Sequence, residues 1–163
     1  MTGRRTGAMI VGAFLLALAL MTAAGALDEG LCLFPDITGW RGGETLWMEL
    51  ETLSEVMGYR SERLYRREAD NHSIQVILLK GPGTLWQGLP KGEICADDGP
   101  VGSGATFRTL EAGGYRAVME DHPLTGKALV VEMAPDSTLT FETAFEDVDL
   151  ERFALVFLKQ YQP

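Results

Sequence analysis

The two histidines are the side chains best suited to acid–base or metal chemistry, and each has carboxylates nearby. His72 follows Asp70 by two residues, and His122 directly follows Glu120 and Asp121. An imidazole beside carboxylates can bind a metal ion or transfer protons. Both segments fall at expected turns, where neighbouring side chains diverge, and neither a zinc-protease pattern nor an acidic calcium loop is present. We therefore expect solvated turn histidines; an enzyme or a metal-binding protein that uses His72 and His122 is the alternative.

No nucleophile or phosphate loop has a complete sequence context. Ser103 lies between two glycines, but Val101 stands where a nucleophile elbow requires Gly, and no strand-turn-helix pattern surrounds it. The glycine-containing segments match neither the P-loop nor the dinucleotide fingerprint. The acidic residues cluster in turns instead of forming a pair in an apolar cleft, as general acid–base catalysis requires. We predict a non-enzymatic protein with no catalytic residue, cofactor or metal.

The two cysteines predict a disulfide. Cys32 and Cys95 form an even pair, which is readily bridged in an oxidising compartment. The bridge would close a loop of 62 intervening residues and tie the mature N-terminus to the domain. Two free thiols, or redox or metal chemistry, are the alternatives, although no C-x-x-C spacing supports the latter.

A Gly/Pro-rich stretch supplies the candidate contact surface. Residues 81–104 contain seven Gly and three Pro, which predicts a long surface loop. This loop carries Leu85, Trp86 and Leu89, and exposed apolar side chains on loops often mark contact with a partner or ligand. The alternative is that Trp86 folds back to close one end of a sheet.

The first 26 residues predict a cleaved signal peptide. Arg4 and Arg5 give a positive start, residues 8–21 are apolar or small, and Ala24-Gly25-Ala26 is a small-x-small cleavage site. The apolar run is short for a membrane span, which needs about 20 residues; an uncleaved anchor is the alternative. We predict cleavage near Ala26, a periplasmic or secreted location, and a single soluble domain at 27–163.

The charge of this domain excludes some partners. The chain has 14 basic and 23 acidic residues, and removal of residues 1–26 takes away two Arg, leaving a net charge of −11. Such a charge repels phosphate backbones and anionic lipid surfaces, so we expect neither nucleic acid nor peripheral membrane binding. An envelope protein or a small ligand is the expected partner. The sequon at Asn71 matters only in a eukaryotic secretory pathway.

Most of the domain shows the two-residue period of strands. A hairpin is predicted from 64–66 and 74–79 around Asp70-Asn71, and the second run is apolar on both faces, as in a central strand. Further strands are expected at 106–110, 115–120, 128–133 and 138–142, with Gly, Pro and Asp in the turns.

Two helices are predicted to flank these strands. Apolar residues at helical spacing between Thr45 and Gly58 indicate a helix near the mature N-terminus, although alternation at 46, 48 and 50 also permits a strand. Asp149 can cap a C-terminal amphipathic helix with an apolar stripe at Leu150, Phe153, Ala154, Phe157, Leu158 and Tyr161. The prediction is an α+β domain: an antiparallel sheet of about five to six strands with both helices, the last packed on the sheet. Its predicted function is to bind a protein partner or small ligand.

Overall fold

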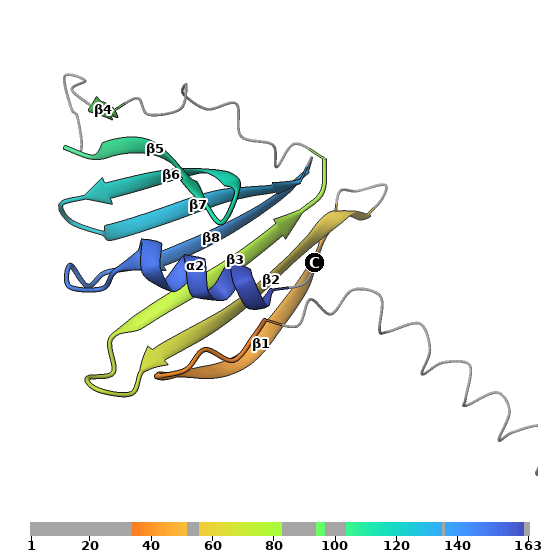
Figure 1. Cartoon of the computed structure of the whole chain (residues 1–163). Coiled ribbons are helices and arrows are strands. Elements are labelled where there is room, and N and C mark those ends of the chain that lie inside the picture. Colours follow the sequence, from red (N-terminus) through yellow and green to blue (C-terminus); the bar gives the residue numbers. More distant parts are fainter. Residues whose placement is uncertain (1–33, 52–55, 83–93, 97–103, 135, 162–163) are drawn as a thin grey trace, which may run out of the picture. The chain divides into compact units, whose positions relative to one another are not determined.

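The described residues form an eight-stranded antiparallel sheet with one helix against one face (Figure 1). This computed structural model describes residues 34–51, 56–82, 94–96, 104–134 and 136–161, with only the backbone of Val56 and of 94–96. All of them belong to one structural unit, Cys32–Pro163. The elements are β1 (Trp40–Glu51), β2 (Val56–Arg67), β3 (Ser73–Lys80), β4 (Ile94–Ala96), β5 (Thr106–Ala112), β6 (Tyr115–His122), β7 (Gly126–Ala134), β8 (Ser137–Thr143) and the helix α2 (Leu150–Gln160).

Two meanders meet in the middle of the sheet. The strand order is β1-β2-β3-β8-β7-β6-β5-β4, so β1 and β4 are the edge strands of the described sheet. The helix-facing side of the sheet is apolar because alternate residues of each strand point to the same face. These residues form the buried cluster and include Ile74, Val76, Leu78, Leu129, Val131, Leu139 and Phe141.

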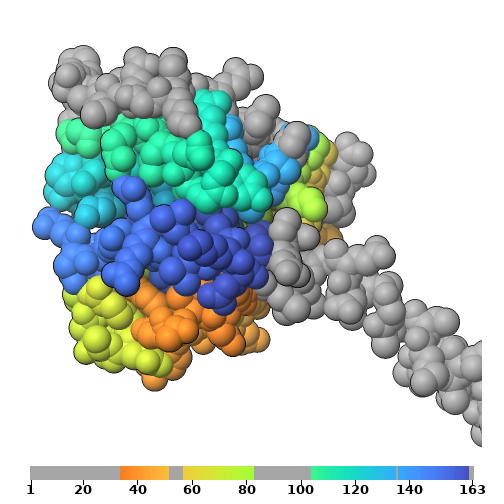
Figure 2. Space-filling view, in the orientation of Figure 1, coloured from red at the N-terminus to blue at the C-terminus, as the bar shows by residue number. Residues whose placement is uncertain are grey.

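Helix α2 begins and packs as its sequence predicts. The Asp149 carboxylate accepts a hydrogen bond from the Arg152 backbone N–H at 3.0 Å, which caps the first turn. Phe153 and Phe157 insert into an aromatic cluster, with the Phe157 ring 5.3 Å from that of Phe141 and the Phe153 ring 5.4 Å from that of Tyr65. Figure 2 shows α2 in blue between the green and cyan residues of β5 and β6 and the yellow and orange residues of β1 and β2.

Several expectations are confirmed by this architecture. The predicted hairpin is the β2–β3 pair, and β3 is an interior strand between β2 and β8. The strands expected at 106–110, 115–120, 128–133 and 138–142 are β5 to β8, and each is two or three residues longer than predicted. The C-terminal amphipathic helix packs on the sheet, and five of its six stripe residues are buried, with Leu158 half-buried.

The expected helix between Thr45 and Gly58 is wrong. Its residues lie in β1 and the start of β2, apart from 52–55, which are outside the described residues. The alternation at 46, 48 and 50 matches the true structure, because β1 pairs with β2 from Trp40 to Glu51. Gly58 permits a close strand approach instead of ending a helix: a Cβ there would lie 2.0 Å from the Lys80 carbonyl oxygen.

The strand count also exceeds the expected five to six. Seven strands have seven residues or more, and β4 has three. The additional strands are β1, in place of the helix, and β4, which lies inside the stretch expected to be only a loop and pairs with β5. No helix in the described part of the chain is long and apolar enough to cross a membrane.

Candidate functional site

The β2–β3 turn brings His72 into a cluster with Asp70 and with Asp147 from the connection that leads to α2. The turn includes Asn71 at φ 64°, and the His72 backbone N–H donates to Asp70 Oδ1 at 3.0 Å. His72 Nδ1 lies 3.1 Å from Asp147 Oδ1, and the imidazole stacks on the Phe145 ring at a centroid distance of 4.0 Å. Ligand atoms of the three residues lie within 4.8 Å of one another, a donor set that a metal ion could use.

Arg67 already supplies a cation to this donor set. Its Nη2 lies 2.7 Å from Asp70 Oδ2, 2.5 Å from Asp147 Oδ2 and 2.9 Å from His72 Nδ1. The hydrogen bond from Arg67 lowers the pKa of Asp70 to about 2, and the same guanidinium lowers the pKa of Asp147. Because one guanidinium nitrogen contacts all three residues, the cluster ties the β2–β3 turn to the start of α2. Its geometry favours a structural role over metal binding.

His122 lies elsewhere. Its Nδ1 accepts hydrogen bonds from the backbone N–H groups of Leu124 at 3.1 Å and Thr125 at 3.2 Å, so it organises the β6–β7 turn. Strands β8 and β7 separate the ends of β3 and β6, which places the two histidine-bearing turns roughly 14 Å apart at the usual strand spacing. The structure therefore does not combine His72 and His122 in one site.

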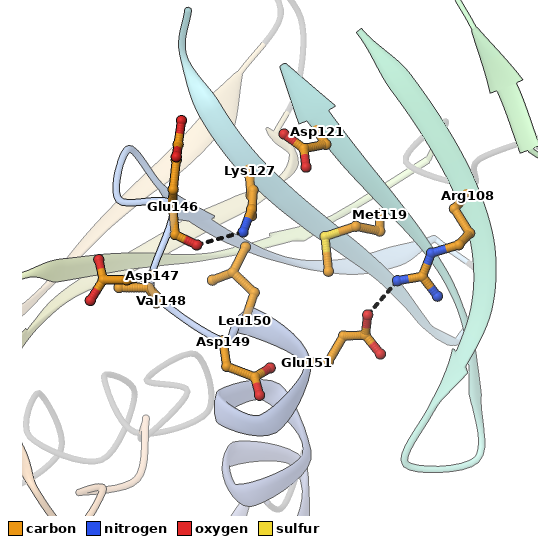
Figure 3. A pocket seen from close by; sticks show the side chains of 10 residues that line it. All are labelled: Arg108, Met119, Asp121, Lys127, Glu146, Asp147, Val148, Asp149, Leu150 and Glu151. Carbon is orange, nitrogen blue, oxygen red and sulfur yellow. Dashed lines mark hydrogen bonds and ion pairs between the residues drawn. The ribbon is translucent and has the colours of Figure 1, made fainter. Parts of the chain in front are cut away.

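An acidic cleft of about 320 Å³ lies beside the first turn of α2 (Figure 3). Lys127 Nζ donates to the Glu146 carbonyl oxygen at 2.7 Å, and Arg108 pairs with Glu151. Its two basic side chains are thus engaged within the domain. Its carboxylates belong to Asp121, Glu146, Asp147, Asp149 and Glu151. Neither of the two buried unpartnered side-chain atoms in the described residues, Ser61 Oγ and Glu132 Oε1, lines this cleft, so nothing in it selects a ligand beyond its negative charge.

The edge strand β1 carries three of the six exposed large apolar side chains in the described residues. Leu46, Trp47 and Met48 are consecutive, and 54%, 43% and 48% of their surfaces are exposed. Trp47 points to the helix side of the sheet, with its ring 6.4 Å from that of Tyr59, while Leu46 and Met48 point to the opposite side. Only β2 pairs with β1 among the described residues, so β1 is an edge of the described sheet, and an edge strand can template pairing with another chain.

Two β-bulges bound the regular part of this edge. The register with β2 shifts between Gly42 and Thr45 and again between Leu50 and Glu51. The six residues from Thr45 to Leu50 pair without interruption, so they form a regularly paired stretch at the edge of the described sheet. This stretch contains all three exposed apolar residues.

The carboxylates of β1 have no ion-pair partner among the described residues. Glu44, Glu49 and Glu51 are exposed. Arg60, which lies across the ladder from Met48, pairs with Glu62 at 2.5 Å. Residues 44–51, called the β1 strip below, therefore combine the exposed apolar side chains of Leu46, Trp47 and Met48 with carboxylates that have no ion-pair partner in the described residues.

Five of the candidate residues singled out from the sequence lie outside the described part of the chain. This applies to Leu85, Trp86, Leu89, Cys32 and Ser103. Cys95 lies in β4, opposite Phe107, but its side chain is not described. The contact surface on the loop and the Cys32–Cys95 disulfide stay predictions.

Sequence reasoning missed both the β1 strip and Asp147. The signal for β1 was present as alternation at 46, 48 and 50, but the helical spacing of the same leucines obscured it. Asp147 is 75 residues from His72, and only strand order brings them together. No protein-family model, curated protein or solved structure matches the chain.

Proposed function

We propose that this chain is an exported, non-enzymatic domain that binds a protein partner through strand β1. The observation that carries the proposal is the run Leu46-Trp47-Met48, about half exposed on an edge strand whose outer side is open in the described sheet. Long apolar edge strands are hazardous in a domain that works alone, because they template pairing with other chains. A partner that covers this strip explains why it remains apolar.

The export part of the proposal rests on the N-terminal sequence. The arginine pair, the apolar run and the small-x-small site within residues 1–26 are the parts of a secretory signal. An envelope protein is the partner expected from that location. N-terminal sequencing of the protein isolated from its own cell tests this part separately, since a mature protein that begins at Met1 would contradict cleavage.

The strip has enough apolar surface for a transient complex. Full burial of a Leu or Met side chain stabilises by roughly 1.5–3 kcal/mol, so burial of the exposed halves of Leu46 and Met48 contributes about 2 kcal/mol together. Loss of that contribution corresponds to about thirtyfold in affinity. Polar side chains of similar length at these two positions would keep the packing of their stems on the sheet.

Site-specific photo-crosslinking in the producing cell tests the interface. A photoreactive residue at Trp47 should give a discrete adduct, and the double variant Leu46→Gln, Met48→Gln should weaken it while changing the melting temperature little. Leu124, which is 88% exposed in the β6–β7 turn, is the matched control position and should give no such adduct. Equal crosslinking at Trp47 and Leu124, or no adduct at Trp47, would reject β1 as the interface.

A further inference from the structure

The two sides of β1 have different chemistry, which restricts the kind of segment that fits beside it. On the side opposite α2 lie Leu46, Met48 and Leu50, because alternate residues share a face. On the helix side lie Thr45, Trp47 and Glu49. One side is therefore apolar, and the other combines an indole with a carboxylate.

The charges behind the apolar side are already neutralised. Glu62 and Arg60 lie opposite Leu46 and Met48 in the register, and they pair with each other at 2.5 Å. Gln75 also donates to Glu62 at 3.2 Å. A neighbouring strand would therefore meet apolar side chains here and no free charge.

The helix side offers a cation two complementary contacts. Glu49 is exposed and has no ion-pair partner in the described residues, and its neighbour across the ladder is Tyr59. Trp47, two residues away on the same side, is partly exposed and held near the Tyr59 ring. An ammonium or guanidinium group can pair with the carboxylate and lie over the indole.

We propose, on the basis of the proposed function, that the occupant of this edge is an extended segment of a partner protein with alternating basic and apolar residues. It adds a strand beside Thr45–Leu50, a mode in which the backbone supplies hydrogen bonds and alternate side chains supply specificity. Its apolar residues pack beside Leu46 and Met48, and its Lys or Arg residues lie beside Trp47 and Glu49. The ladder accommodates about six residues between the two bulges.

A second copy of the chain is the competing occupant, and charge disfavours it. Pairing of β1 with its own copy would bring two sets of Glu44, Glu49 and Glu51 to one interface, with only Arg41 of each strand to offset them. The net charge, −9 for the full chain and −11 without residues 1–26, adds general repulsion between copies. A basic segment removes this repulsion.

The test uses a labelled eight-residue peptide in which Lys alternates with Val and Ile, titrated with residues 27–163 in low salt. We expect saturable binding with amide shifts confined to β1 and β2. A peptide of the same composition with its Lys residues grouped together, and one with Glu in place of Lys, should bind at least tenfold more weakly. N-methylation of alternate peptide amides should abolish binding, since it removes the donors of the added strand.

Two variants of the domain, titrated with the alternating peptide, complete the test. Glu49→Gln should weaken binding about two- to fivefold, as expected for a partly exposed ion pair, whereas Glu68→Gln, an exposed carboxylate in the β2–β3 turn, should have no effect. Equal binding of all three peptides, or a dimer of the domain that excludes the peptide, would overturn the basic-segment inference. The two proposals are separable. If the peptide test fails but a photoreactive residue at Trp47 still gives a discrete adduct, β1 remains an interface. If Trp47 gives no adduct, the proposed function is rejected as well.

Discussion

Arg67→Met offers the sharpest test of how the charged cluster works. The substitution keeps the length of the side chain and removes the guanidinium that contacts Asp70, Asp147 and His72. The hydrogen bond from Arg67 is the largest influence on the pKa of Asp70, which is about 2. We therefore expect the Asp70 pKa to rise in the variant towards about 3.9, the value of an unperturbed Asp. Carboxyl-detected NMR titration would measure the change directly.

The pH dependence of stability follows from the sign of the shift. A carboxyl whose folded-state pKa is lowered stabilises the fold above its unfolded pKa and loses that contribution as the pH falls through its folded pKa. For Asp70 the window is from about 4 down to about 2, and Asp147 has a shift of the same sign. The wild type should therefore be more stable than Arg67→Met at pH 6, and the difference should shrink towards pH 2. Urea unfolding at several pH values, with His72→Asn in both backgrounds to remove the imidazole, measures this difference.

The same variant tests the metal hypothesis. If Arg67 holds the donors, Zn²⁺ should leave the melting temperature of the wild type unchanged and raise that of Arg67→Met, in which Asp70, His72 and Asp147 are free to bind it. An Asp70 pKa that stays near 2 in the variant would refute the role given to Arg67. Stabilisation of the wild type by Zn²⁺ would instead support a metal-binding protein.

Two further substitutions test the packing of the fold by urea unfolding. Gly126→Ala should lower the free energy of unfolding by more than about 3 kcal/mol, because φ is 95° and the new Cβ would lie 2.2 Å from the Thr143 carbonyl oxygen. The control is Gly114→Ala, where φ is 90° and nothing lies within 4 Å, so the loss should be about 1–2 kcal/mol. Equal losses would contradict the contact at Gly126. Phe157→Ala should cost about 3–5 kcal/mol because its ring is fully buried, whereas Val156→Ala on the outer side of α2 should stay within about 1 kcal/mol; similar losses would contradict the helix orientation.

The sequence predicted elements well where only one periodicity was present. Strand β8 alternates apolar and polar residues, Gly, Pro and Asp mark the turns between β5 and β8, and α2 has a cap and an apolar stripe at helical spacing. Between Thr45 and Gly58 the leucines fit both periods, so local pattern could not decide. Tertiary pairing did: β1 lies beside β2 along twelve residues, and that partner is invisible to a local window.

The candidate site was less predictable than the fold because it depends on strand order. His72 and Asp70 are neighbours in sequence, and their turn was expected. Asp147 joins them only because β8 lies next to β3, which carries the end of β8 to the β2–β3 turn. No sequence motif singles out Arg67, and its role appears only from its contacts with Asp70, His72 and Asp147.

The net charge of the chain does not show which carboxylates can meet a partner, whereas the distribution of ion pairs does. The carboxylates of Asp70, Asp147, Glu62 and Glu151 are paired with arginines of the same domain, so they offer little to a partner. Those of Glu44, Glu49 and Glu51 have no ion-pair partner among the described residues and accompany three exposed apolar residues on an edge of the described sheet. A domain that needed only solubility would have polar residues in place of the exposed apolar residues on this edge. Their coincidence on β1 is what a basic, extended partner segment requires, and it makes the peptide titration decisive for the kind of partner.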